Sequence, residues 1–335
     1  MQLIKTLPTD TWQTLLKEAS IDLTTLLSRL NLTEEQTNAS TSAARHFKLQ
    51  VPQPFLDRIE KGNPQDPLLL QILPQLAELE THPGFSHDPL EEKSANPAPG
   101  LIHKYQGRVL LVLSGACAIN CRYCFRRHFP YAENQLSGQH WKQVKDYIKN
   151  DQSISEVIFS GGDPLATSDK RLQQMVQDLG EIPHVKRLRI HTRLPVVIPQ
   201  RITDDLCQIF SVSRLNIVCV LHANHPQEID SAVSSAIKRL QDTGVTLLNQ
   251  AVLLKGINDS VKTLKNLSET LFESRVLPYY LFVLDPVTGS AHFDIKDEQA
   301  IQLVQALQSQ LPGYLVPRLA REIPGRPSKT LLTLN

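Results

Sequence analysis

The chain has 335 residues, with 35 Lys and Arg against 34 Asp and Glu, so its formal net charge is +1 at pH 7. A surface without an excess of either charge argues against nucleic acid or an anionic membrane as a direct partner. No apolar run approaches the length of a membrane span, and the stretch from Met1 to Thr6 lacks the pattern of a signal peptide, so we expect a cytoplasmic protein.

Residues 1–100 are predicted to form an N-terminal helical and wrapping region. Apolar residues recur there at helical spacing in two stretches, Trp12, Leu15, Leu16, Ala19 and then Leu23, Leu26, Leu27, Leu30. Prolines interrupt the segment from Val51 to Gly100, where they stop helices and favour an extended path. We expect this segment to wrap around a second domain, residues 101–335, and to carry no chemistry.

From Val109 onward, strand-like and helix-like segments alternate, which predicts an α/β fold with a parallel sheet. The expected strands are Val109–Ser114, Glu156–Ser160, Arg187–His191, Leu215–Leu221, Leu247–Leu253 and Tyr279–Leu284. The expected crossover helices lie near 139–150, 169–180, 202–211, 227–243, 260–274 and 296–310. Six such units predict a partial (β/α)6 barrel that stays open.

Three cysteines, Cys117, Cys121 and Cys124, follow the first expected strand within eight residues. Three thiolates without a nearby fourth can hold three corners of a [4Fe-4S] cluster and leave one iron open. This spacing, with an aromatic Tyr123 before the last cysteine, resembles that of the radical S-adenosylmethionine (SAM) enzymes. The resemblance implies that the open iron binds SAM and that the cluster cleaves it to a 5'-deoxyadenosyl radical.

A structural zinc site is the alternative for the same motif, but it usually needs four protein ligands. The fourth would have to be His103, His128 or a distant cysteine. The two remaining cysteines, Cys207 and Cys219, lie in apolar surroundings and are predicted to be packing thiols. Five cysteines with three of them clustered do not form a disulfide framework, which agrees with a reducing compartment.

Polar motifs fall at or near the carboxyl ends of the expected strands, the face on which barrels of this kind carry their sites. They are the cysteine motif, Ser160-Gly-Gly-Asp-Pro164, His191-Thr-Arg, His222-Ala-Asn-His-Pro226, Asn249-Gln250 and Asp285. Gly161 and Gly162 would let the backbone approach a ligand, and Asp163 could accept a hydrogen bond from an ammonium group. A tight turn alone would also explain Gly-Gly-Asp-Pro.

The span from about Lys104 to Lys329 resembles the lysine 2,3-aminomutase family. The motifs that carry the resemblance are Gly107-Arg-Val-Leu-Leu, Cys117-Ala-Ile-Asn-Cys-Arg-Tyr-Cys-Phe-Arg-Arg-His, Ser160-Gly-Gly-Asp-Pro-Leu, Arg193-Leu-Pro-Val-Val-Ile-Pro-Gln-Arg-Ile, Asn224-His-Pro, Asn249-Gln-Ala-Val-Leu-Leu-Lys-Gly-Ile-Asn-Asp and Pro278-Tyr-Tyr. The resemblance implies three cofactors: a [4Fe-4S] cluster, SAM and pyridoxal 5'-phosphate (PLP). PLP would supply a π-system, and the protein would hold the reacting groups in position.

Individual residues match the motifs of this family and take their implied roles from it. Cys117, Cys121 and Cys124 match the cluster ligands, and Gly161, Gly162 and Asp163 belong to the loop that faces the SAM amino group. Lys329 matches the lysine that carries PLP, Arg108 and Lys104 match positions that bind its phosphate, and His222 and Gln250 match residues that line its pocket. The family has arginine where this chain has Lys104, and a solvated basic stretch is the alternative for Lys104 and Arg108.

Substrate contacts are implied for Arg126, Asp285 and Glu322. A guanidinium such as that of Arg126 offers a two-pronged contact to a substrate carboxylate. Asp285 and Glu322 match the acidic pair that neutralises the ε-ammonium of lysine, although Glu322 is one methylene longer than the aspartate of the family. The alternative for Glu322 is a surface pair with Arg321. Glutamate as substrate would place a third carboxylate beside these two, which like-charge repulsion disfavours.

Within the family, the chain resembles the branch that makes (R)-β-lysine, which a separate ligase attaches to elongation factor P. The resemblance rests on the Pro327-Ser328-Lys329 loop, the segment from Asp285 to Phe293, the Trp12 helix and a C-terminus at Asn335 soon after Lys329. We therefore expect an isomerase that converts L-α-lysine to (R)-β-lysine. The alternatives are an aminomutase for another amino acid such as glutamate, a catabolic lysine enzyme, and a non-catalytic iron–sulfur or zinc sensor. The sequence also leaves the oligomeric state open, with a homo-oligomer as one possibility.

Overall fold

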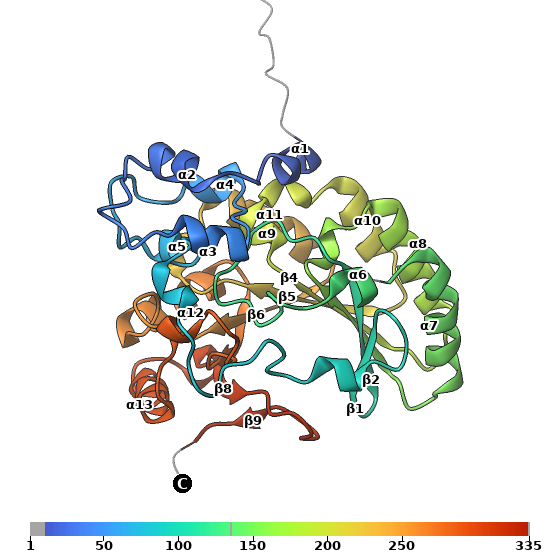
Figure 1. The fold of residues 1–335 in the computed structure, drawn as a ribbon. Coiled ribbons are helices and arrows are strands. Elements are labelled where there is room, and N and C mark those ends of the chain that lie inside the picture. Colours follow the sequence, from blue (N-terminus) through green and yellow to red (C-terminus); the bar gives the residue numbers. More distant parts are fainter. Residues whose placement is uncertain (1–10, 135, 334–335) are drawn as a thin grey trace, which may run out of the picture.

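The computed structural model describes residues 11–134 and 136–333 (Figure 1). Met1 to Thr6, where the sequence shows no signal-peptide pattern, and the terminal Asn335 lie outside the described residues. In the described part of the chain, no helix combines the length and apolar character that a bilayer crossing requires.

In the described residues, nine strands form one sheet in which each strand pairs with the next along the chain. The strands are β1 (Leu101–Tyr105), β2 (Arg108–Ser114), β3 (Glu156–Gly161), β4 (Arg187–Thr192), β5 (Asn216–His222), β6 (Thr246–Val252), β7 (Leu277–Phe282), β8 (Arg318–Arg321) and β9 (Thr330–Leu331). Strands β2 to β8 run parallel, whereas β1 and β9 pair antiparallel at the two edges. No pairing joins β1 to β9 among the described residues, so the barrel is open.

The six strands predicted from sequence are β2 to β7, and each lies within two residues of its expected bounds. The open α/β barrel is therefore confirmed, but the expected set of strands was incomplete. Strand β8 adds a seventh parallel strand, and its four residues, Arg-Leu-Ala-Arg, are too short and too polar to predict a buried strand from sequence. Strand β1 forms a hairpin with β2, in which Gly107 adopts the positive φ of +77° that a tight turn requires.

Crossover helices cover the outside of the sheet (Figure 1). They include α7 (Gly138–Asn150), α8 (Asp169–Gly180), α10 (Asp204–Ser211), α11 (Ser231–Asp242), α12 (Val261–Glu273) and α13 (Asp297–Gln308), which confirm the expected helices. Each presents one apolar face to the sheet, as α8 does with Leu172, Met175, Val176 and Leu179. Shorter turns complete this part of the chain: α6 (Tyr131–Asn134), η3 (Pro164–Ala166), α9 (Leu194–Val197), η4 (Pro199–Arg201), η5 (Pro226–Glu228), η6 (Ala291–Phe293) and η7 (Gly313–Leu315).

The N-terminal segment consists of short helices that pack beside the barrel (blue in Figure 1). They are α1 (Trp12–Lys17), α2 (Leu23–Arg29), α3 (Thr41–His46), α4 (Gln53–Leu56), α5 (Pro67–Leu70), η1 (Leu76–Leu79) and η2 (Glu92–Ala95). Helices α1 and α2 confirm the expected periodicity, but the segment after Val51 is less extended than expected. Its prolines begin helical turns, because a proline at the first helical position loses no hydrogen bond, as Pro67 shows behind the Asp66 cap. The expected domain boundary at residue 100 stays a prediction.

Candidate active site

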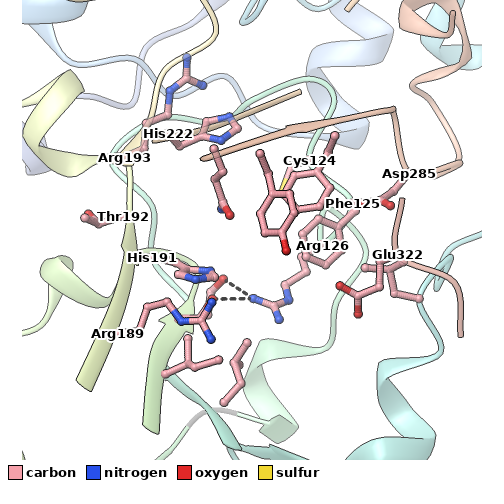
Figure 2. Close-up of a pocket in the computed structure, with 18 of the residues that line it drawn as sticks. Cys124, Phe125, Arg126, Arg189, His191, Thr192, Arg193, His222, Asp285 and Glu322 are labelled. Atoms are coloured by element: carbon pink, nitrogen blue, oxygen red, sulfur yellow. Dashed lines mark hydrogen bonds between the residues drawn. The ribbon is translucent and has the colours of Figure 1, made fainter. Parts of the chain in front are cut away.

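A cavity of about 760 Å³ lies within the barrel and reaches from the carboxyl ends of the strands to Arg108 at the start of β2. Every site residue predicted from sequence lines it: Lys104, Arg108, Cys117, Cys121, Cys124, Arg126, Gly161, Gly162, Asp163, His222, Gln250, Asp285, Glu322 and Lys329. Figure 2 shows Arg126 near the middle of the cavity, with Arg189 and His191 on one side and Asp285 and Glu322 on the other. The fold thus brings together residues that are up to 225 positions apart, from Lys104 to Lys329.

The cysteine loop, residues 115–128, follows β2 and is held by the N-terminal segment. The backbone amides of Asn120 and Arg122 donate to the carbonyls of Gln50 and Gln71, at 3.0 and 2.9 Å. The Gln50 side chain donates in turn to the carbonyl oxygen of Cys117 at 2.6 Å. The conformation of the loop therefore depends on a segment that we expected only to wrap around the barrel.

The three thiols of the loop are free, and Cys117 and Cys124 lie where negative charge is unfavourable. Burial raises the pKa of the Cys117 thiol, and the charges of Cys124, Asp163 and Cys121 raise it further. Burial and the neighbouring Cys121 raise the pKa of Cys124 to about 11. A thiolate at Cys117 or Cys124 needs positive charge beside it, and the irons of a [4Fe-4S] cluster supply that charge. The thiol set therefore fits a cluster.

A zinc site fits the loop less well. Within residues 11–134 and 136–333, no three His, Cys, Asp or Glu side chains converge as ligands of one metal ion. In a [4Fe-4S] cluster each thiolate binds a different iron, so the three sulfurs need not converge on one point. Cys219 is buried on β5 and Cys207 is half-buried on α10, and neither lines the cavity, in agreement with the prediction that they pack.

An ion triad stands behind the cysteine loop. Arg122 is fully buried and donates to both carboxylate oxygens of Glu78, at 2.8 and 2.6 Å. Arg127 donates to the same carboxylate at 2.7 Å. Glu78 belongs to η1 in the N-terminal segment, so this triad fixes the residues on either side of Cys124 to that segment.

The Gly-Gly-Asp turn packs tightly against the cysteine loop. A Cβ atom on Gly161 would lie 2.6 Å from the Ser114 carbonyl oxygen, and one on Gly162 would lie 2.5 Å from that of Ala116. The two glycines therefore let two backbones approach each other, whereas we expected approach to a ligand. The Asp163 amide donates to the Ala116 carbonyl at 2.8 Å, which joins the two loops.

The Asp163 carboxylate is buried and caps the end of β4. One oxygen accepts from Thr192 Oγ1 at 2.7 Å and the Leu165 amide at 3.0 Å, and the other accepts from the amides of Arg193 and Leu194 at 2.8 and 3.0 Å. Both oxygens thus have protein donors, although burial still raises the pKa of this carboxyl. The expected contact with an ammonium group stays a prediction.

Arg193 connects the cysteine loop to the wall of the cavity. It donates to the Cys121 sulfur at 2.7 Å, the Tyr123 hydroxyl at 2.8 Å and the Glu228 carboxylate at 2.8 Å. The Tyr123 hydroxyl also lies 2.9 Å from His222 Nε2. Burial, and then Arg193, lowers the pKa of His222 to about 3, so this imidazole is neutral where it lines the cavity.

Lys329 and Lys104 share one carboxylate, that of Glu322. The Lys329 ammonium donates to Glu322 Oε2 at 2.6 Å and lies 4.9 Å from the centre of the Phe282 ring, while Lys104 donates to Oε1 at 3.0 Å. Burial raises the pKa of Glu322, but Lys329 and Lys104 lower it to about 2 overall. The alternative surface pair of Glu322 with Arg321 is wrong, because Arg321 binds Asp297 at 2.6 and 2.8 Å.

Asp285 lines the cavity beside Glu322, and its carboxylate has no hydrogen-bond donor among the described residues. Burial raises the pKa of Asp285 to about 7, and the charge of Glu322 contributes to the increase while Lys329 opposes it. A carboxylate held in this way gains by pairing with a cation that enters the cavity.

Arg108 and Arg189 are among the cations of the cavity that retain capacity to bind an anion. Arg108 stacks on the Tyr105 ring at 4.6 Å, and its guanidinium has no hydrogen-bond acceptor among the described residues. Arg189 on β4 donates to Glu156 at 2.9 Å, but its Nε is buried without an acceptor in the described part of the chain. Arg108 therefore fits a phosphate group, whereas Lys104 is already paired with Glu322.

Sequence reasoning missed Glu92 and Arg189 and named His191 only as part of a polar motif, and all three line the cavity. Glu92 binds Arg126 through both carboxylate oxygens, at 2.7 and 2.7 Å, although it lies in the segment that was expected to carry no chemistry. Arg189 and His191 alternate with buried residues along β4, and this alternation was the signal that could have placed them inside the barrel. No local signal could have paired Glu92 with Arg126.

A 4Fe-4S single cluster domain matches residues 105–190, which contain the three cysteines. The L-lysine 2,3-aminomutase of Haemophilus influenzae is 54% identical over 320 residues, which cover 96% of this chain and 95% of that protein. The chain belongs to the L-lysine 2,3-aminomutase family. The L-lysine 2,3-aminomutase of Escherichia coli is 52% identical, with 96% of this chain and 94% of that protein covered. The L-lysine 2,3-aminomutase of Clostridium subterminale is 36% identical, with 89% of this chain and 72% of that protein covered.

Membership of the L-lysine 2,3-aminomutase family confirms the predicted enzyme class, an isomerase, and argues against a non-catalytic sensor. The domain match confirms the predicted [4Fe-4S] cluster, and SAM and PLP are the other cofactors of this family. Among solved structures, a radical SAM methyltransferase from Sphaerobacter thermophilus superposes with a TM-score of 0.46 at 17% identity, over 66% of this chain and 68% of that one.

Proposed function

We propose that this protein is a cytoplasmic, radical SAM and PLP-dependent aminomutase that converts L-α-lysine to (R)-β-lysine for modification of elongation factor P. The observation that carries the choice of lysine is the acidic pair Asp285 and Glu322, which faces the cavity beside Lys329. When bound, the cluster and SAM supply a carbon radical and PLP supplies a π-system beside the migrating nitrogen.

Different residues of the cavity bind the two charged ends of the substrate. Arg126 holds the α-carboxylate, and Asp285 and Glu322 hold the ε-ammonium, which would otherwise cost several kcal/mol to bury without a counter-charge. Glu322 already accepts two ammonium groups, those of Lys104 and Lys329, so its longer side chain reaches into the cavity. The Asp285 carboxylate has no donor among the described residues and is the stronger candidate for first contact with the incoming ammonium.

Cofactor roles follow from the contacts of the remaining residues. Cys117, Cys121 and Cys124 hold the cluster, while Arg193 at the Cys121 sulfur restrains that side of the loop. Lys329 carries PLP, and Arg108 binds its phosphate because the guanidinium has no competing acceptor among the described residues. The neutral His222, together with Gln250, lines the pocket for the ring. Lys104 donates to Glu322 and to the Leu90 carbonyl, which leaves one of its three N–H groups for the phosphate.

Glutamate as the substrate is disfavoured by the same acidic pair. The pKa of Asp285 is already raised to about 7 by burial and by the charge of Glu322. A third carboxylate would increase this repulsion without gaining a partner. The link to elongation factor P is supported by the Pro327-Ser328-Lys329 loop and the segment from Asp285 to Phe293, which resemble that branch of the family.

The proposed function is tested by incubating the reconstituted enzyme anaerobically with SAM, a reductant and either L-lysine or L-glutamate. Chiral product analysis should find (R)-β-lysine and no β-glutamate. Equal or faster turnover of glutamate would overturn the choice of substrate. The product should then be accepted by the ligase that modifies elongation factor P, and a ligase that takes L-α-lysine but not this product would overturn the pathway assignment.

A further inference from the structure

The guanidinium of Arg126 is already bound as if to a substrate carboxylate. Its Nε and Nη2 donate to the two oxygens of Glu92, at 2.7 and 2.7 Å, and both side chains are about 6% exposed. Its Nη1 donates to Ser160 Oγ at 3.0 Å and to the Gly161 carbonyl at 3.2 Å. A protein carboxylate therefore occupies the fork that the proposed function assigns to the α-carboxylate.

The number of donors limits what Arg126 can bind at the same time. A guanidinium has five N–H groups, and the contacts with Glu92, Ser160 and Gly161 leave one of them, on Nη2. One hydrogen cannot form a two-pronged contact. A substrate carboxylate can be held by the fork only if Glu92 moves away.

A second cation besides Arg126 lies close to the Glu92 carboxylate. The Lys104 ammonium lies 3.8 Å from Glu92 Oε1 and donates to the Leu90 carbonyl at 3.0 Å. A short movement of the carboxylate would therefore exchange one cation for another. Glu91, directly before Glu92, adopts a left-handed conformation with φ of 49°, which is unfavourable for a residue other than glycine and favours release of the segment.

We propose that Glu92 is an internal stand-in for the substrate carboxylate. It keeps the buried Arg126 paired while the cavity is empty, gives way to the α-carboxylate of the incoming substrate and turns to Lys104. This inference rests on the proposed function, because it takes Arg126 as the carboxylate-binding residue. It adds a competition at that residue, which sets the affinity for every ligand that carries a carboxylate.

The test compares the wild type with Glu92→Gln, using three ligands and isothermal titration calorimetry on the anaerobically reconstituted enzyme. L-Lysine has both charged ends, L-norleucine has the carboxylate but no ε-ammonium, and cadaverine has the ε-ammonium but no carboxylate. Glu91→Gln is the matched control, since it removes the same charge one residue earlier, outside the cavity.

If Glu92 occupies Arg126 in this way, Glu92→Gln should bind lysine and norleucine at least about tenfold more tightly than the wild type. The ligand then no longer displaces a buried ion pair. Cadaverine affinity should not change, and Glu91→Gln should bind all three ligands like the wild type. Weaker binding of lysine and norleucine by Glu92→Gln would overturn the inference and make Glu92 a positioning residue for Arg126. An equal gain for cadaverine would overturn it as well, because it would reflect only the altered charge of the cavity.

The proposed function fails by a different result, in which the wild type binds norleucine as tightly as lysine. If Glu92→Gln does not fold, hydrogen exchange on the wild type gives an independent answer. Lysine and norleucine should increase exchange of the backbone amides of residues 91–95, whereas cadaverine should not. Slower or unchanged exchange in this segment with lysine would overturn the stand-in.

Discussion

Arg122, in the cysteine loop, and Glu78, in the N-terminal segment, form a fully buried ion pair with two hydrogen bonds of 2.8 and 2.6 Å. The pair joins the cysteine loop to a segment 44 residues earlier in the chain. Arg127 adds a third charge at 2.7 Å, so the carboxylate neutralises two guanidinium groups. The geometry of the thiols therefore depends on a carboxylate that lies outside the cavity.

Replacing Glu78 with alanine should destabilise the protein by about 3–5 kcal/mol, because it leaves Arg122 buried without a counter-charge. Iron content should fall with it, since the loop between Cys121 and Cys124 loses its support. Denaturant unfolding and an iron assay on anaerobically purified protein measure the two effects. Glu80→Ala is the control, because the Glu80 side chain is 66% exposed and its loss should change stability by less than about 0.5 kcal/mol. Full iron content in a folded Glu78→Ala protein would contradict this role.

Cluster binding should depend on Cys117, Cys121 and Cys124 and not on the other cysteines. Alanine at any of the three should abolish the iron–sulfur absorbance, since three thiolates are the minimum that holds the cluster with one iron open. Cys207→Ala and Cys219→Ala should retain iron, because neither residue lines the cavity. Loss of the cluster from either control in a folded protein would show that the ligand set is different.

Lys329 should carry PLP, since its ammonium lies in the cavity within 2.6 Å of Glu322. Lys329→Ala should lose the visible absorbance of bound PLP and retain the iron–sulfur absorbance. Borohydride reduction of the wild type, followed by peptide mass spectrometry, should label Lys329. The exposed Lys262→Ala is the matched control and should keep both signals. A label on another lysine would refute the assignment.

Lysine binding should strengthen as the pH rises toward 7. The pKa of Asp285 is raised to about 7, so this carboxyl is neutral at lower pH and gains the charge that pairs with the ε-ammonium only as the pH approaches that value. The apparent Kd for lysine should fall by up to about tenfold per pH unit below 7 and level off above it. Calorimetric titrations from pH 5.5 to 8.5 measure this dependence.

Asp285→Asn provides the matched comparison for this pH profile. The variant should bind lysine weakly at every pH and lose most of the slope, while PLP and iron content stay unchanged. A wild-type profile without a slope between pH 5.5 and 7 would show that Asp285 does not titrate in contact with the substrate.

Much of the fold could be predicted because strands such as β2 and β3 are largely buried and consist of apolar runs. The run from Val109 to Leu113 illustrates this, since the strand ends where the polar cysteine motif begins. Strand β8 escaped because Leu319 and Ala320 are its only apolar residues and its position depends on pairing with β7. A strand that forms because its neighbour pairs with it cannot be predicted from its own residues.

The membership of the candidate site could also be predicted, whereas the pairing within it could not. Cys117, Asp163 and Lys329 were located by motif, and all three line the cavity. The contacts of Lys104 with Glu322 and of Arg126 with Glu92 join residues 218 and 34 positions apart. Such ion pairs depend on the packing of distant segments, and local spacing carries no information about them.

The order of supports along the chain has a consequence for synthesis on the ribosome. Gln50, Gln71 and Glu78, which hold the cysteine loop, all precede Cys117, so they leave the ribosome before the thiols do. Lys329 and its partner Glu322 are made much later. Because nascent chains fold from the N-terminus onward, these supports can form first, and the contacts of Asp163 and Arg193 with the loop are added later. The described contacts that hold the cysteine loop therefore all come from residues that are synthesised before Lys329.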